Sequence, residues 1–452
     1  MRYVDAVGAW CALGYAALAF AARQPGEPDL ATFFVLVAWT GLPVFGLYLY
    51  FRRRGEPFPV SRLIFWAVVF RICGLAGGPF YEDDFYRYLW DAHRFATTGT
   101  PYGAAPEEFF VDPGVPVPFQ GVLDGINYPE LPTIYGPTTQ LVFLFGYGLQ
   151  PASVTALQAV LIAVDLATVA LLLRLTSPAN VLLYAWCPLV VKEIAFTAHP
   201  DGAGVCLLLA AIVLSRNRRW PGAAVCLGLA AGAKTFGLVL APLVLAGARV
   251  RHWLVFGVTL AALYGPFALL GGTDLASLQV FARDWEFNSA LYGLLATVAP
   301  RFEARLVLGF AFAAFWCYYL WYTRRGAHGI PRGDWVFGAL LASSPVINPW
   351  YLLWLLPFAA VYPSVWAWTA SVALLLSYVT GLNLQDYQMH PYAQPLWARW
   401  LQFGLVLAGL GYDLTRRRGG VGSLAGAQRR WRGLPAGRRP PGAGGPVDAA
   451  RG

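Results

Sequence analysis

Long apolar segments recur along almost the entire chain, and they limit the possible folds more than any other feature. The first three are Val7–Ala22, Ala31–Phe51 and Val60–Gly77. Charged residues make up only 13% of the sequence, whereas a soluble globular domain has about 25%. A helix that crosses a bilayer needs about 20 mainly apolar residues. We therefore expect an all-α polytopic membrane protein with one transmembrane body over residues 1–414.

The positive charge of the chain is concentrated at one end. The net charge is +9, and the segment from Arg416 onward contains nine arginines and one aspartate, so this segment carries +8 and the rest of the chain +1. Basic residues that follow a span favour the cytoplasmic side and contact anionic lipid, so the charge does not indicate a nucleic-acid partner. Residues 415–452 are also rich in Gly, Pro and Ala, and we expect a disordered cytoplasmic tail.

Short motifs give no sign of a nucleotide, disulfide or zinc site. All six cysteines lie in apolar stretches and none forms a CxxC pair, so we interpret them as small buried hydrophobic residues. The sequence has no Walker motif, no GxGxxG on a βαβ unit, no HExxH and no GxSxG. The N-terminus lacks a basic region and a convincing cleavage site, and we expect the first apolar segment to remain as a span.

Arginine clusters set the orientation of the predicted spans. Arg52, Arg53 and Arg54 follow the second apolar segment, and the positive-inside rule places them in the cytoplasm. The third segment then leads outward, so residues 78–135 form a long first extracytoplasmic loop. This loop contains nine acidic residues and two arginines and is too polar to cross the membrane.

The segments after the loop do not alternate regularly. Three apolar pieces follow it, at Thr138–Leu149, Val154–Leu173 and Asn180–Val191, although both ends of this region belong outside. One of the pieces must therefore be a half-span or a re-entrant segment. Several later pieces are also short, and broken helices are tolerated where they line a cavity enclosed by protein. We expect roughly eleven to thirteen spans, with short broken helices around an internal cavity.

The stretch Tyr81–His93 opens the loop and concentrates acidic and aromatic side chains. Its regularly spaced polar residues, at i, i+3, i+4 and i+7, are Asp84, Arg87, Tyr88 and Asp91. In a helix these positions share one face. A carboxylate on this face is suited to activate a hydroxyl group, with the arginine and the second carboxylate organising the site. The alternative is that Asp83 or Asp84 only caps the helix, which leaves Asp91 unexplained.

Further polar clusters fall on the same side of the membrane in this orientation. They are Asn127–Tyr135, Lys192-Glu193 with His199–Asp201, Lys234-Thr235, Arg283–Asn288, Asn348–Tyr351 and Gln385–His390. The two lysines are the only ones in the chain. An ammonium group at membrane depth is suited to bind a phosphate as a point charge.

Several of these residues are also compatible with a purely structural role that involves no substrate. An ion pair between Lys192 and either Glu193 or Asp201 would hold broken helices together without touching a substrate. Trp285 and Tyr351 are of the residue types that form an aromatic belt at membrane interfaces.

Several of these motifs together resemble a known family. Asp83–Asp91, followed by Gly99–Tyr102 and Pro106-Glu107, resembles the first-loop signature of the GT-C superfamily of membrane glycosyltransferases, above all its bacterial polyprenyl-phosphate-mannose-dependent mannosyltransferase-like members. The other similar stretches are Tyr128–Pro137, Lys192-Glu193 with His199–Asp201, Trp285 with Asn288, and Pro349–Tyr351. The chain departs from the pattern at Gly136, where relatives often have proline, and in the extra apolar segments before the loop.

The resemblance implies a GT-C-type transmembrane bundle in the plasma (inner) membrane with an extracytoplasmic active site. The implied donor is a polyprenyl-phosphate sugar, with mannose favoured, and the acceptor is a glycan or a lipid. Asp84 matches the general base of an inverting transfer best, with Asp83 as the alternative. The expected substrate-binding residues are Arg87, Tyr88, Asp91, Tyr135, Lys192, Glu193, His199, Asp201, Lys234, Trp285, Asn288 and Tyr351. Some members of the superfamily use a divalent metal, but we predict neither a metal nor another cofactor here.

Two other classes of function compete with sugar transfer. A transporter or flippase of lipid-linked sugars would show internal repeats and charges in the middle of spans, but no convincing repeat is present and the charges gather at one face. A scaffold for envelope assembly would leave the acidic loop unexplained.

Overall fold

The computed structural model describes residues 2–324 and 329–418. This part of the chain is helical throughout, and its one sheet-like contact is an isolated bridge between Phe287 and Val346. The six described helices that are long and apolar enough to cross a membrane are α1 (Arg2–Ala22), α2 (Leu30–Arg54), α3 (Val60–Gly77), α7 (Val154–Leu172), α13 (Val250–Leu269) and α16 (Arg301–Arg324). The expectation of an all-α, multi-pass membrane protein is confirmed.

A broken apolar segment accompanies these six helices. α8 (Pro178–Ala185) is followed by α9 (Pro188–Val190) and by a π-helix, η2 (Val191–Phe196), and the two halves are bent by 49°. Cys187 adopts an extended backbone conformation before Pro188, as the residue before a proline usually does. This bend falls in one of the three apolar pieces between residues 136 and 200, and counting the segment as one span raises the number of candidates to seven. Which piece is the half-span or re-entrant segment stays a prediction.

The other helices of the bundle are shorter, except for the 23-residue α21. They are α6 (Pro137–Leu149), α10 (Asp201–Arg216), α11 (Trp220–Ala233), α12 (Phe236–Val244), α17 (Gly333–Ser343), η3 (Pro349–Trp354), α18 (Leu356–Val361), α19 (Val365–Ala373), η4 (Leu374–Tyr378) and α21 (Leu396–Arg418). The expectation of short, broken helices is confirmed. The larger count of eleven to thirteen spans includes such helices and stays a prediction. The predicted tail lies outside the described residues from position 419, and its first four residues, 415–418, belong to α21.

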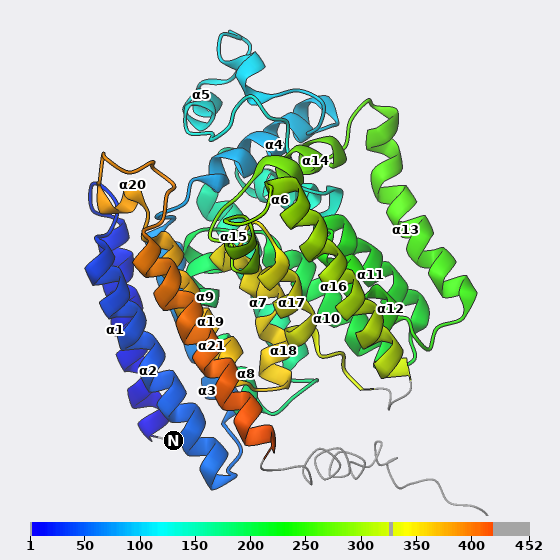
Figure 1. Ribbon diagram of the computed structural model, residues 1–452. Helices are drawn as coiled ribbons and strands as arrows, with labels where there is room; N and C mark the ends of the chain where they lie inside the picture. Colours follow the sequence, from blue (N-terminus) through cyan, green and yellow to red (C-terminus); the bar gives the residue numbers. More distant parts are fainter. Residues whose placement is uncertain (1, 325–328, 419–452) are drawn as a thin grey trace, which may run out of the picture.

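The short helices of the loops between the longer ones gather at one end of the bundle (Figure 1). They are α4 (Asp84–Thr98), η1 (Pro106–Phe109), α5 (Val117–Asp124), α14 (Leu275–Asp284), α15 (Leu291–Leu295) and α20 (Gly381–Leu384). In Figure 1, α4 and α5 lie at the top of the molecule, while α1 and α2 form the left edge and α13 the right edge. Because α4 packs against both α5 and α6, the acidic loop is anchored to the helical body and not free in solution.

Candidate functional site

A cavity of about 580 Å³ lies where the acidic loop meets the helical body. Its walls come from the start of α4, the segment before α6, the start of α10, the α11–α12 junction, the end of α14, and η3 and η4. This volume is within the range of about 300–1,000 Å³ that small-molecule sites occupy. Segments that are far apart in the sequence therefore form one site of suitable size for a ligand.

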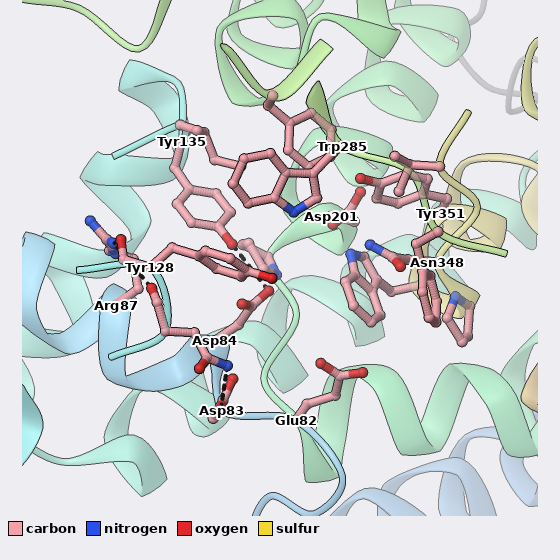
Figure 2. Close-up of a pocket in the computed structure, with 18 of the residues that line it drawn as sticks. Glu82, Asp83, Asp84, Arg87, Tyr128, Tyr135, Asp201, Trp285, Asn348 and Tyr351 are labelled. Atoms are coloured by element: carbon pink, nitrogen blue, oxygen red, sulfur yellow. Dashed lines mark hydrogen bonds between the residues drawn. The ribbon is translucent and has the colours of Figure 1, made fainter. Parts of the chain in front are cut away.

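The structure brings many of the predicted site residues into this cavity. Those that line it are Asp83, Asp84, Arg87, Tyr135, Asp201, Lys234, Trp285 and Tyr351. Figure 2 shows Asp84 and Tyr135 on one side of the cavity and Asp201 and Tyr351 on the other. The predicted residues that are not among its lining side chains are Tyr88, Asp91, Lys192, Glu193, His199 and Asn288.

Asp84 is the first residue of α4, and two tyrosines hold its carboxylate. The Tyr135 hydroxyl donates to Asp84 Oδ2 at 3.2 Å, and the Tyr88 hydroxyl does so at 3.4 Å. Burial raises the pKa of Asp84, while the two tyrosine hydrogen bonds act in the opposite direction. A fixed carboxylate with a raised pKa is suited to accept a proton from a substrate hydroxyl.

Asp83 precedes α4, at the N-cap position, but its side chain makes no capping hydrogen bond. Instead, Asn127 Nδ2 donates to Asp83 Oδ2 at 2.5 Å. Burial, and then the charge of neighbouring Asp84, raise the pKa of Asp83 to about 6. The hypothesis that Asp83 serves only as a helix cap is therefore wrong.

Arg87 holds the segment that covers the site. Its guanidinium donates to the backbone carbonyls of Leu131 at 2.8 Å and Tyr128 at 2.9 Å, with a longer contact of 3.4 Å to that of Asn127. Tyr128 has a positive φ of 51°, which is uncommon for a residue with a side chain. The arginine thus fixes a strained turn at the cavity, in addition to lining it.

Lys234 supplies a cation to the cavity wall. Its Nζ lies 2.7 Å from Asp201 Oδ1, and the indole N–H of Trp354 donates to the same oxygen at 2.7 Å. The ammonium also lies 4.1 Å from the ring centroid of Tyr351. The Lys234 side chain is 27% exposed, so its charge is held by Asp201 and is still accessible from the cavity.

The other lysine is buried behind the cavity wall. Lys192 Nζ contacts the hydroxyl of Tyr378 and lies 3.5 Å from Glu193 Oε2, and both charged side chains are at most 2% exposed. The ion pair expected as a structural alternative thus forms with Glu193, whereas Asp201 pairs with Lys234. His199 is also completely buried, next to this pair.

Asp91 and Asn288 serve as internal anchors. Gln140 on α6 donates to Asp91 Oδ2 at 2.8 Å, and Asp91 is only 2% exposed. Asn288 donates to the carbonyl of Ile347 at 3.2 Å and accepts a hydrogen bond from Gln402. These contacts hold α4 and the segment after α14 in place, and neither Asp91 nor Asn288 lines the cavity.

Several lining residues were not among the predicted site residues. They are Glu27, Glu82, Asn127, Tyr128, Glu286, Asn348, Trp350, Trp354, Tyr378 and Tyr392. Figure 2 shows the Glu82 carboxylate below Asn348 at the lower side of the cavity. Many of them lie next to a predicted residue, so position in a polar cluster could have indicated them. Tyr378 lies in an apolar segment and offered no such signal.

The aspartates at the start of the first loop are divided between the cavity and the helical body. Asp83 and Asp84 line the cavity, but Asp91 points toward Gln140. In residues 2–324 and 329–418, no three His, Cys, Asp or Glu side chains are grouped so that they could hold a metal ion.

Comparison with known proteins assigns no family. No family model matches the chain, and no curated protein matches its sequence.

Proposed function

We propose that this protein is a membrane glycosyltransferase of the GT-C type, which transfers a sugar from a polyprenyl-phosphate donor to a hydroxyl group of a glycan or lipid acceptor. The sugar proposed first is mannose, and the site is proposed to face the extracytoplasmic side of the plasma membrane. The observation that carries the proposal is that Asp84 and Lys234 line one cavity at the end of an apolar helical bundle.

The chemistry of the two residues fits the two halves of such a reaction. The Asp84 carboxylate takes the proton of the acceptor hydroxyl as that oxygen attacks the anomeric carbon of the donor. The bond between the anomeric carbon and the phosphate oxygen breaks, and the polyprenyl phosphate leaves with the bonding electrons. The Lys234 ammonium stabilises the negative charge of this phosphate.

The remaining walls suit a sugar. Trp285, Trp350 and Tyr351 offer aromatic faces, while the Asn127 and Asn348 amides offer hydrogen-bonding groups. The apolar helices next to the cavity provide a place for the hydrocarbon chain of a lipid-linked donor. A nucleotide-sugar donor from the cytoplasm would require a soluble nucleotide-binding domain, for which the sequence has no motif.

The direct test offers purified protein a panel of radiolabelled polyprenyl-phosphate sugars, including the mannosyl donor, together with a membrane extract as the source of acceptors. The expected result is transfer of label from one donor to a product, with loss of transfer in Asp84→Asn. If no donor yields a product, while labelled lipid crosses the bilayer of proteoliposomes, the protein is a transporter and the proposal is wrong.

A further inference from the structure

A series of buried polar side chains leads from Asp84 away from the cavity. The Tyr88 hydroxyl, 3.4 Å from Asp84 Oδ2, also lies 3.3 Å from His199 Nδ1. On the other side of the imidazole ring, His199 Nε2 lies 3.4 Å from Glu193 Oε2. This Nε2 is buried and makes no hydrogen bond to any described residue, although the Glu193 carboxylate lies within reach of it.

The backbone around His199 departs from regular helix geometry in a way that produces this alignment. Glu193 belongs to the π-helix η2, and single π-helical turns are frequent at functional sites. Ala198 follows with a φ of +59°, an uncommon value for a residue with a side chain. The ring of Trp350 stacks on His199 with centroids 3.9 Å apart and an interplanar angle of 14°, which fixes the imidazole plane.

The Glu193 end of the series also contacts a residue that lines the cavity. Tyr378, whose side chain lines the cavity, donates its hydroxyl proton to Glu193 Oε1 at 2.9 Å. Ionisable groups face this region from several elements. They are Asp84 and Tyr88 from α4, Tyr135 from the segment before α6, Lys192 and Glu193 from η2, Tyr378 from η4, and Glu82, Asp201 and Lys234 from the cavity wall.

We infer that Tyr88 and His199 relay the proton that Asp84 takes from the acceptor hydroxyl to Glu193, an inference that rests on the proposed sugar transfer. Once Asp84 is protonated, the Tyr88 hydroxyl turns from Asp84 to donate to His199 Nδ1. Asp84 then passes its proton to the Tyr88 oxygen while the Tyr88 hydroxyl proton moves to His199 Nδ1. His199 then gives the proton on Nε2 to Glu193. One proton has moved, Asp84 is again a carboxylate, and Glu193 is neutral.

A relay is useful because donor and acceptor fill the cavity during transfer and exclude the water that would otherwise remove the proton. The three distances of 3.3–3.4 Å are at the long end for hydrogen bonds. Catalytic contacts are often long or poorly aligned without substrate and tighten when it is bound. The contact between His199 Nε2 and Glu193 needs better alignment as well as a shorter distance.

The first test does not depend on activity. The chain contains five histidines, and ¹⁵N spectra of histidine-labelled protein assign the His199 signal by its loss in His199→Gln. The relay requires a neutral ring with the proton on Nε2 and an accepting Nδ1, and Tyr88→Phe must shift the Nδ1 signal. A ring that carries its proton on Nδ1, or an Nδ1 signal unchanged in Tyr88→Phe, would overturn the inference even if the enzyme transfers sugar.

The second test uses kinetics. Tyr88→Phe keeps the ring that stacks on Phe143, with centroids 4.6 Å apart, and removes only the hydroxyl. We expect Tyr88→Phe and His199→Gln each to lower kcat by about 10-fold to 100-fold with an unchanged KM for the donor, and the double variant to be no slower than either single one, because both interrupt the same path.

A matched control is available on the same helix. His93 stacks on Phe119, with ring centroids 4.0 Å apart, and does not line the cavity. His93→Gln is expected to keep kcat near the wild-type value. If the effects of Tyr88→Phe and His199→Gln multiply, or if Tyr88→Phe has a normal kcat, the two residues do not form a relay. Absence of transfer by the wild-type protein would count against the proposed function, and the ¹⁵N spectra would still decide the relay geometry.

Discussion

Arg71 of α3 and Asp165 of α7 form a buried ion pair, with Arg71 Nη2 2.5 Å and Nε 2.6 Å from Asp165 Oδ2, and neither side chain is more than 1% exposed. The Tyr184 hydroxyl donates to the other carboxylate oxygen at 2.8 Å. Arg71 also donates to the carbonyl of Ala185 at 2.9 Å, at the point where α8 ends. The pair thus ties α3 and α7 to the break that leads into the π-helix of the site.

Loss of one partner of this pair should destabilise the whole bundle. Arg71→Met leaves the Asp165 carboxylate buried without a counter-charge, which typically costs about 3–5 kcal/mol. We expect a clearly lower unfolding temperature in detergent, and recovery of most of it in Arg71→Met/Asp165→Leu. Arg283→Met is the control, because Arg283 pairs with Asp284 at the surface with side chains 75% and 46% exposed. An Arg71→Met protein as stable as wild type would contradict this role.

Asp84→Asn should separate catalysis from folding. The amide oxygen of asparagine can still accept the hydrogen bond of Tyr135, so the fold is preserved, but the amide cannot take up a proton. We expect kcat to fall by about 10²–10⁴-fold, the typical contribution of a general base, with an unchanged unfolding temperature. Asp83→Asn should have a smaller effect, because Asp83 is engaged by Asn127. Normal transfer by both variants would show that neither residue is the base.

Local spacing in the sequence predicted the part of the site that lies on one helix. The i, i+3, i+4, i+7 pattern predicted that Asp84, Arg87, Tyr88 and Asp91 share a face. In α4, Asp84 and Arg87 contact the segment before α6, Tyr88 contacts His199, and Asp91 contacts Gln140 of α6. The partner of Tyr88 is His199, which is 111 residues away in the sequence. A contact of this kind arises from tertiary packing, and residue spacing in a single sequence carries no information about it.

The two lysines illustrate the same limit. Both lysines lie in apolar surroundings beside a polar residue, so the local sequence predicts the same role for both. Lys192 lies in the π-helix η2, where it is buried and contacts Tyr378 and Glu193. Lys234 follows the end of α11, and its side chain lines the cavity. The difference depends on a helix break that creates the π-turn, and helix boundaries of this kind do not follow from composition.

Substitution of each lysine should therefore have a different result. Lys234→Gln removes the cation proposed to bind the phosphate, and we expect KM for the donor to rise about 10-fold, equivalent to about 1.4 kcal/mol. Lys192→Gln leaves Glu193 without its ammonium partner in a buried position, so we expect a lower unfolding temperature. Lys234→Gln also leaves a buried carboxylate, that of Asp201, without its ammonium partner, so both variants are expected to unfold at a lower temperature. The contrast is therefore checked on KM, by kinetics with a titrated donor, with thermal unfolding measured for both variants. A rise in KM for Lys192→Gln at full stability would reverse the assignment.

Asp91 should make the stability of the protein depend on pH. Burial raises the pKa of Asp91 to about 6, compared with about 3.9 in an unfolded chain. Between these values the folded protein binds more protons than the unfolded chain, so the free energy of unfolding falls as the pH rises from about 4 to about 6, by up to about 3 kcal/mol from this residue.

Asp91→Asn should remove this contribution, because the amide has no charge and its oxygen can still accept the hydrogen bond from Gln140. The measurement is the unfolding temperature of wild type and variant at about pH 4 and about pH 7, the lower edge of this window and a pH above it. The advantage of the variant should grow with pH. Asp112→Asn, at an exposed position of the same loop, should show no such trend. A constant difference between Asp91→Asn and wild type would disprove the prediction.

Tyr128 and Trp285 should control how the sugar is held. Their rings make an edge-to-face contact at the cavity, with centroids 4.8 Å apart and an interplanar angle of 66°. Arg87 fixes the backbone carbonyl of Tyr128, and Phe281 stacks on the Trp285 ring with centroids 5.6 Å apart, so both residues of the pair are held by a neighbour. Rigid aromatic rings bind a sugar ring with little loss of entropy, and an aromatic pair contributes about 0.5–1.5 kcal/mol beyond its buried area.

Trp285→Ala should consequently raise the KM for the donor or the acceptor by about 10-fold, or about 1.4 kcal/mol, and change kcat much less. Trp285→Phe keeps an aromatic face toward Tyr128 and should recover most of the affinity. Trp397→Ala is the control for loss of a tryptophan, because Trp397 is 57% exposed on α21 and does not line the cavity. Steady-state kinetics with each substrate varied in turn show which one is held by the pair. A fall in kcat without any change in either KM would instead assign Trp285 to the reacting centre.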